Sequence, residues 1–105
     1  MNNDKEELRI EKIKNGNILT CKLSGWLDPN TSPNLISEIN LNDVKTLIFD
    51  MANVEYIFSS GIRALLMLQK MLEKSGGKIK IINVSDNIRN IFEYAGLDSM
   101  LDTKI

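Results

Sequence analysis

The sequence predicts an α/β sandwich: a mixed four-stranded sheet, opened by a β-hairpin and packed against three to four helices. Three observations predict it. Alternating apolar and polar residues flank a turn signal at Asn15-Gly16, two apolar strand-like runs lie at 47–51 and 78–84, and amphipathic helical segments precede and follow these runs. Parallel strands joined by helices need right-handed crossovers, and sites in such folds lie beyond the carboxyl ends of the strands.

Composition limits the functions that the chain can serve. Its 105 residues, 43% of them hydrophobic, suggest a single domain over 1–105 with a modest core. The 13 basic and 14 acidic residues nearly cancel, so nucleic acid is not an expected partner. No apolar stretch approaches the ~20 residues that span a bilayer, and the N-terminus does not resemble a signal peptide. The lone cysteine, Cys21, fits a reducing compartment, so we expect a cytoplasmic protein with no membrane partner.

Histidine is absent from the sequence. The commonest general base and the commonest metal ligand are therefore missing, and one cysteine cannot hold zinc or iron alone. A carboxylate-only hydrolase stays open, although no paired acidic cluster suggests one. We expect no catalytic residue, no metal site and no cofactor, and we expect that the protein is not an enzyme.

The hairpin is predicted by Asn15-Gly16, because a type I′ turn needs positive φ at both central positions. Pairing outward from this turn places Ile13 opposite Ile18 and Ile10 opposite Cys21. One face of the hairpin is then apolar and carries Leu8, Ile10, Leu19, Cys21 and Leu23. The opposite face is mostly polar, and Lys12 is the one misfit on the apolar face.

A loop over 24–30 and a short helix are expected next. Ser32 would cap this helix, with Pro33 at its first position and with Leu35, Ile36 and Ile39 inward. The run 47–51 follows as a buried strand, and the stretch 52–57 as its connection to the next helix.

The longest helix is predicted from about Ser60 to Lys74, ending at 75–77. Its apolar stripe at ~100° intervals contains Gly61, Ala64, Leu65, Leu68, Met71 and Leu72. Ile62 and Leu66 fall off this stripe. After the strand 78–84, Ser85 would cap a last helix that Gly96 closes. That helix would turn Ile88, Ile91, Phe92 and Ala95 inward, and Leu97, Met100 and Leu101 would fold back as a terminal turn.

The tetrapeptide 58–61, Phe-Ser-Ser-Gly, is the most informative segment, because it joins a strand to the longest helix. Serine oxygens cap helix N-termini by accepting bonds from free backbone N–H groups. The same helix end is the positive pole of the helix dipole and suits a phosphate. A serine here either caps the helix or presents its hydroxyl for reversible phosphorylation.

Four segments, in order, resemble the STAS domain family, the anti-sigma factor antagonists and their relatives. The run 47–66 resembles the family signature, and 23–28 followed by Thr31 is similar to its L-x-G-x-L-D loop. Gly76-Gly77 before a strand and the segment 88–97 agree with the family as well. The resemblance covers nearly the whole chain and implies a STAS-like sandwich.

The resemblance also implies a regulatory site. The first serine of the family's D-S-S-G motif, here Ser59, is phosphorylated by a partner kinase that doubles as an anti-sigma factor, and a serine phosphatase reverses the modification. The unphosphorylated antagonist binds the anti-sigma factor and frees the sigma factor. Phe58 stands where the family usually has aspartate, and this difference removes a charge beside the serine. The residues expected to contact the partner are Asp28, Thr31, Phe58, Ser60, Gly61, Ile62 and Leu66.

Other interpretations remain open. Asp28 fits a plain turn residue, Ile62 and Leu66 fit packing against a neighbouring helix, and Trp26 fits either a lid or an interface anchor. Two rival functions are a STAS module that binds a nucleotide or other small anion near Ser59, and a scaffold subunit of a sensory complex. A response-regulator receiver fits poorly, because no acidic cluster accompanies Asp50.

Overall fold

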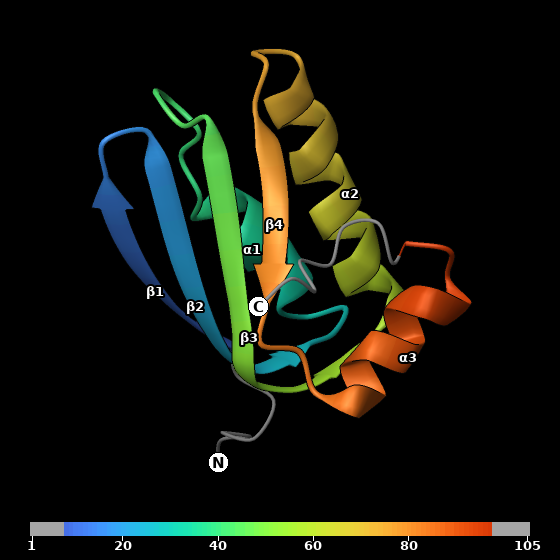
Figure 1. Ribbon diagram of the computed structural model, residues 1–105. Helices are drawn as coiled ribbons and strands as arrows, with labels where there is room; N and C mark the ends of the chain where they lie inside the picture. Colours follow the sequence, from blue (N-terminus) through green and yellow to red (C-terminus); the bar gives the residue numbers. More distant parts are fainter. Residues whose placement is uncertain (1–7, 98–105) are drawn as a thin grey trace.

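The computed structural model describes residues 8–97, which form a mixed four-stranded sheet with helices packed against it (Figure 1). The elements in chain order are β1 (Leu8–Asn15), β2 (Ile18–Leu27), α1 (Ser32–Ser37), β3 (Thr46–Ile57), α2 (Ser59–Glu73), β4 (Lys78–Ile82) and α3 (Asp86–Tyr94). The strand order is β1-β2-β3-β4, with β1 antiparallel to β2, and with β3 parallel to both β2 and β4. The predicted sandwich is confirmed.

The hairpin turn lies one residue later than the sequence predicts. Asn15 pairs with Ile18, so Gly16 and Asn17 form the turn, and Ile10 faces Leu23 instead of Cys21. A type II′ turn needs positive φ only at its first central position, which Gly16 supplies at +63°. The predicted register is therefore wrong by two residues. A shift of two leaves each side chain on its predicted face, so the apolar face is correct.

Strands β2 and β3 both extend further than predicted. The residues 24–27 continue β2 and the residues 52–57 continue β3, whereas the sequence predicts a loop and a connection there. The two extensions pair in parallel, with register shifts between Lys22 and Ser24 and between Gly25 and Trp26. Their backbone groups satisfy one another, and Leu27 and Ile57 are buried at the end of the ladder.

Two helix details differ from the prediction. The N-cap of α1 is Thr31, not Ser32, and it makes no side-chain capping bond. On α2 the stripe is buried at Gly61, Ala64, Leu65, Leu68 and Leu72. Met71 is 45% exposed, because it lies at the edge of the stripe, one turn after Met67, which is exposed as well.

The last helix begins and ends largely as predicted. Ser85 is its N-cap, and the Ile88 amide donates to Ser85 Oγ at 3.3 Å. Gly96 closes the helix with a φ of +76°, and the Leu97 amide donates to the Phe92 carbonyl at 2.8 Å. Ala95 is exposed and not inward, because it is the C-cap residue. Met100 and Leu101 lie outside the described residues.

The core lies between the sheet and the helices, of which α1 and α2 cover the same face of the sheet (Figure 1), and α3 adds Ile88 and Phe92 to it. Its largest fully buried side chains include Phe49 of β3, Leu68 of α2 and Phe92 of α3. In the part of the chain that the structure describes, no helix has the length and apolar character to span a membrane.

Candidate partner-binding site

The site is built where β3 passes into α2. Phe58 is the N-cap residue of α2 and has an extended backbone. Its amide donates to the Leu27 carbonyl at 2.8 Å, which continues the β2–β3 ladder, and its carbonyl accepts from the Gly61 and Ile62 amides at 2.9 and 3.1 Å. The strand therefore turns into the helix within one residue, with no loop between them.

The two serines have different surroundings. Neither caps α2 through its side chain. Ser59 is the first residue of the helix and is exposed, whereas Ser60 is half-buried. Ser60 Oγ is shielded from solvent and has no hydrogen-bond partner among the described residues. The capping interpretation is thus wrong for both serines, and the exposed one is Ser59.

Gly61 holds the start of α2 against the sheet. It is buried, and a Cβ atom at this position would lie 2.8 Å from Leu27 Cβ and 2.9 Å from Ile57 Cγ1. No side chain fits in that space without displacing its neighbours. The packing of Gly61 fixes the height of the first helical turn above β2 and β3, and so fixes where Ser59 stands.

Asp28 and Thr31 shape the loop between β2 and α1. Asp28 Oδ1 accepts from the amides of Asn30 and Thr31, each at 2.9 Å, and the Thr31 hydroxyl donates to the Trp26 carbonyl at 2.7 Å. Both side chains are buried, Asp28 with 6% of its surface exposed. Asp28 Oδ1 and the Thr31 hydroxyl are therefore occupied within the loop, and Pro29 and Asn30 are the residues that the loop exposes.

Three aromatic rings cluster beside the serines at the ends of β2 and β3. Tyr56 and Phe58 meet edge-on, with ring centroids 4.8 Å apart, and the Trp26 ring lies 6.2 Å from Phe58. Trp26 Nε1 donates to a carboxylate oxygen of Glu55 at 3.2 Å. Tyr56 and Phe58 are 42% and 39% exposed, so the cluster presents apolar surface directly before Ser59.

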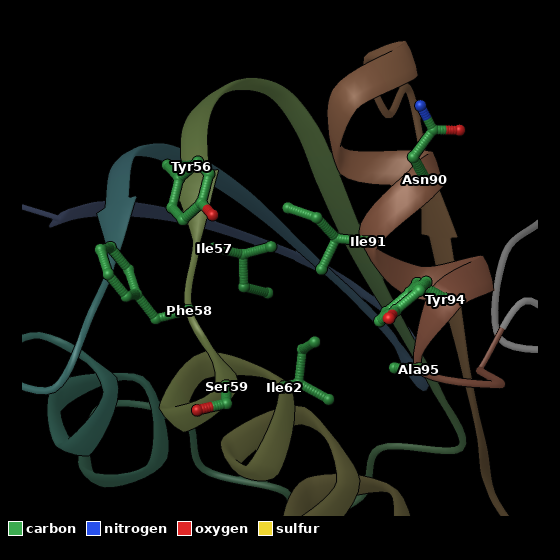
Figure 2. Close-up of a pocket in the computed structure, with 9 residues that line it drawn as sticks. All are labelled: Tyr56, Ile57, Phe58, Ser59, Ile62, Asn90, Ile91, Tyr94 and Ala95. Atoms are coloured by element: carbon green, nitrogen blue, oxygen red, sulfur yellow. The ribbon is translucent and has the colours of Figure 1, made fainter.

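An open apolar groove runs between the start of α2 and α3 (Figure 2). This α2–α3 groove has a volume of about 490 Å³ and is lined by Tyr56, Ile57, Phe58, Ser59, Ile62, Asn90, Ile91, Tyr94 and Ala95. Figure 2 shows Ile57, Ile62 and Ile91 pointing into the space between the two helices. Tyr94 is 96% exposed. Ser59 therefore stands at the edge of a hollow apolar surface.

The contribution of β3 and α3 to this groove was not predicted from the sequence. The residues that were not among the predicted candidates include Tyr56, Asn90, Ile91 and Tyr94. The spacing of Asn90, Ile91 and Tyr94 gives a signal, because residues three and four apart share one helix face. Of the two candidates off the α2 stripe, Ile62 lines the groove and Leu66 does not, and both are half-buried against the core.

A smaller pocket lies on the other side of α2. This α1–α2 pocket, of about 290 Å³, is lined by Pro29, Ser32, Pro33, Ile36, Ser60, Arg63, Ala64 and Met67. Ser32 Oγ, like Ser60 Oγ, is buried with no hydrogen-bond partner among the described residues. The first turn of α2 holds no acidic residue. Within 8–97, no cluster of His, Cys, Asp and Glu side chains could hold a metal ion.

Comparison with known proteins agrees with this architecture. A sequence of 27% identity over 97 residues, covering 90% of each chain, is the anti-sigma-B factor antagonist of Staphylococcus aureus. The solved structure of the anti-sigma factor antagonist SpoIIAA in its unphosphorylated form superposes with a TM-score of 0.80, at 22% identity, covering 91% of this chain and 86% of that chain. The Bacillus cell fate determinant SpoIIAA in its phosphorylated form superposes with a TM-score of 0.72, also at 22% identity, over 91% and 89% of the two chains. The STAS domain family model matches residues 9–105, and the chain therefore belongs to the STAS domain family.

Proposed function

We propose that this protein is an anti-sigma factor antagonist that acts by binding an anti-sigma factor and performs no catalysis of its own. In this proposal the bound partner is a serine kinase, and phosphorylation of Ser59 ends the binding. A serine phosphatase restores it. The names of the relatives support the general activity.

The single observation that carries the proposal is the position of Ser59. It is the exposed serine of the pair, it begins α2, and it lies at the edge of the α2–α3 groove beside the Tyr56–Phe58 ring pair. A partner that covers this apolar surface would enclose the Ser59 hydroxyl as well. We propose the surface around Ser59, including Phe58 and Ile62, as the binding site, with the loop shaped by Asp28 and Thr31 at its border.

The proposed chemistry is a phosphoryl transfer from a nucleoside triphosphate. Ser59 Oγ forms a bond to the γ-phosphorus, the bond between that phosphorus and the β–γ bridging oxygen breaks, and the diphosphate leaves. The hydroxyl proton passes to a base on the kinase. The product carries about −1.5 to −2 charges at pH 7 in place of a neutral hydroxyl. The dipole of α2 tolerates this charge, whereas an apolar partner surface does not, because burying an unpaired charge is costly.

The test compares wild type with Ser59→Asp and Ser59→Ala. Tagged proteins are expressed in the native host, co-purifying proteins are identified, and the binary affinity of any anti-sigma kinase found is measured by calorimetry. Wild type and Ser59→Ala should bind, and Ser59→Asp should lose binding while melting close to wild type. Ser85→Asp is the matched control, because Ser85 also stands at a helix N-terminus and aspartate is an equally good cap there.

Two results would contradict the proposal. One is equal binding of the anti-sigma kinase by wild type and Ser59→Asp. The other is a large loss of thermal stability in Ser59→Asp, which would assign Ser59 a structural role. Titration of wild type with ATP and GTP tests the rival function as a nucleotide-binding module, and saturable binding of either nucleotide would favour that rival.

A further inference from the structure

Arg63 lies one helical turn after Ser59 on the exposed side of α2. In an α-helix, residues four apart are surface neighbours, with Cβ atoms about 5–6 Å from each other. Long helical side chains lean toward the N-terminus and cover the preceding turn. The guanidinium of Arg63 can therefore reach the space above Ser59 Oγ without any movement of the backbone.

Among the described residues, no side chain competes for Arg63 at this end of the helix. Its guanidinium forms no hydrogen bond or ion pair with the residues 8–97. The first turn of α2 contains no acidic residue, and the N-cap position is occupied by the apolar Phe58. The exposed guanidinium of Arg63, with its N–H donors, thus lies one helical turn from the proposed modification site.

We propose that Arg63 is the internal counter-ion of a phosphoryl group on Ser59. The inference rests on the proposed modification of Ser59. A phosphoserine presents three strong acceptor oxygens, and a guanidinium donates to two of them at once in a bidentate, charge-assisted pair. The phosphorylated form is then held by a side chain of the same helix, four residues along the chain.

The same pairing changes a second surface. Arg63 lines the α1–α2 pocket together with Ser60 and Met67. When its guanidinium turns back toward a phosphate on Ser59, it leaves the rim of that pocket. One modification thus alters the charge at the α2–α3 groove and the lining of the α1–α2 pocket on the other side of the helix.

The experiment places phosphoserine at position 59 of the full chain during translation, so that no kinase is needed. Melting temperatures of the phosphorylated and unphosphorylated proteins are compared for wild type, Arg63→Gln and Arg63→Lys. Lys70→Gln is the matched control, because it removes the same charge from the same helix about 16 Å along the axis from Ser59. Phosphorus NMR titration gives the second pKa of the phosphate in each protein.

Phosphorylation should raise the melting temperature of wild type by about 2–4 °C more than that of Arg63→Gln. Lys70→Gln should behave like wild type, and Arg63→Lys should fall between wild type and Arg63→Gln. The phosphate pKa should be about 0.3 unit lower in wild type than in Arg63→Gln, since the pair favours the dianion. At 1 M salt, where the Debye length is about 3 Å, these differences should shrink.

The inference would be overturned if phosphorylation raised the melting temperature equally in wild type and Arg63→Gln. It would also be overturned if Lys70→Gln reduced this rise as much as Arg63→Gln does. Neither kinase nor anti-sigma partner takes part in the measurement. Failure of the proposed function would therefore leave these readings unchanged, and failure of the Arg63 pairing would leave the Ser59→Asp binding test unchanged.

Discussion

Gly61 packs against Leu27 so closely that a Cβ atom at position 61 would lie 2.8 Å from Leu27 Cβ and 3.1 Å from the Leu27 carbonyl oxygen. This contact joins the start of α2 to the end of β2. Phe58 makes the adjacent link, because its backbone amide donates a hydrogen bond to the same carbonyl. The position of Ser59 above the sheet is set by these two contacts.

Replacing Gly61 with alanine should lower the free energy of unfolding by about 1–3 kcal/mol, because the added methyl group meets Leu27 and Ile57. Alanine favours a helix by about 1 kcal/mol over glycine, so a loss despite that gain would identify steric strain. Urea denaturation measures the change. A Gly61→Ala protein as stable as wild type would mean that α2 can rise from the sheet at no cost.

Ser60→Ala should leave the free energy of unfolding unchanged or raise it by up to about 1 kcal/mol, because it removes a buried hydroxyl that has no partner among the described residues. Ser85→Ala should instead cost about 1 kcal/mol, since Ser85 Oγ accepts the Ile88 amide as a cap. The two variants are compared in the same urea titration. Equal destabilisation by both would show that Ser60 Oγ is bonded in solution.

Incubation with the cognate kinase and ATP should label Ser59 and leave Ser60 unmodified. Ser59 is exposed, whereas Ser60 Oγ is shielded from solvent and is therefore less accessible to a kinase active site. Phosphopeptide mass spectrometry of Ser59→Ala and Ser60→Ala measures the result. Labelling of Ser59→Ala, with none on Ser60→Ala, would reverse the assignment.

Alanine substitutions of Ile62 and Leu66 should have different effects on partner binding and on folding stability, although both side chains are half-buried on the same side of α2. Ile62→Ala should weaken partner binding by about 1–2 kcal/mol, because Ile62 lines the α2–α3 groove beside Ser59. Leu66→Ala should lower folding stability by about 1–2 kcal/mol, less than a fully buried leucine, and leave binding near wild type. Paired denaturation curves and binding isotherms decide. A larger binding loss in Leu66→Ala would move the partner surface further along α2.

Cys21 should make folding stability depend on pH in the alkaline range. Burial raises the pKa of the Cys21 thiol to about 11, and the charge of Lys12 opposes the shift only in part. The unfolded thiol ionises earlier, near its ordinary pKa of about 8.5. The free energy of unfolding should therefore be unaffected below pH 8 and fall between about pH 9 and 11. The difference in the free energy of unfolding between wild type and Cys21→Ala separates the contribution of Cys21 from the titration of tyrosines and lysines. If this difference did not change with pH, the prediction would be contradicted.

The sequence alone determined the features that depend on neighbours along the chain. The alternation of β1 and β2 set which face of the hairpin is apolar, even though the register was wrong by two residues. Ser85 and Gly96 marked the ends of α3, because a cap bond and a positive φ are properties of a few consecutive residues. The family resemblance added the overall fold and the identity of the candidate serine.

Tertiary structure decided what depends on distant segments. The extension of β3 to Ile57 requires β2 to pair beside it, and that pairing removes the loop expected before Ser59. Ser59 is exposed and Ser60 Oγ is buried because of the way α2 packs against β2, β3 and α1. The α2–α3 groove joins Tyr56 to Tyr94, residues on separate elements whose shared surface no local pattern encodes. Local bonding fixes periodicity and caps, but burial depends on which elements pack together, and only the folded chain fixes that.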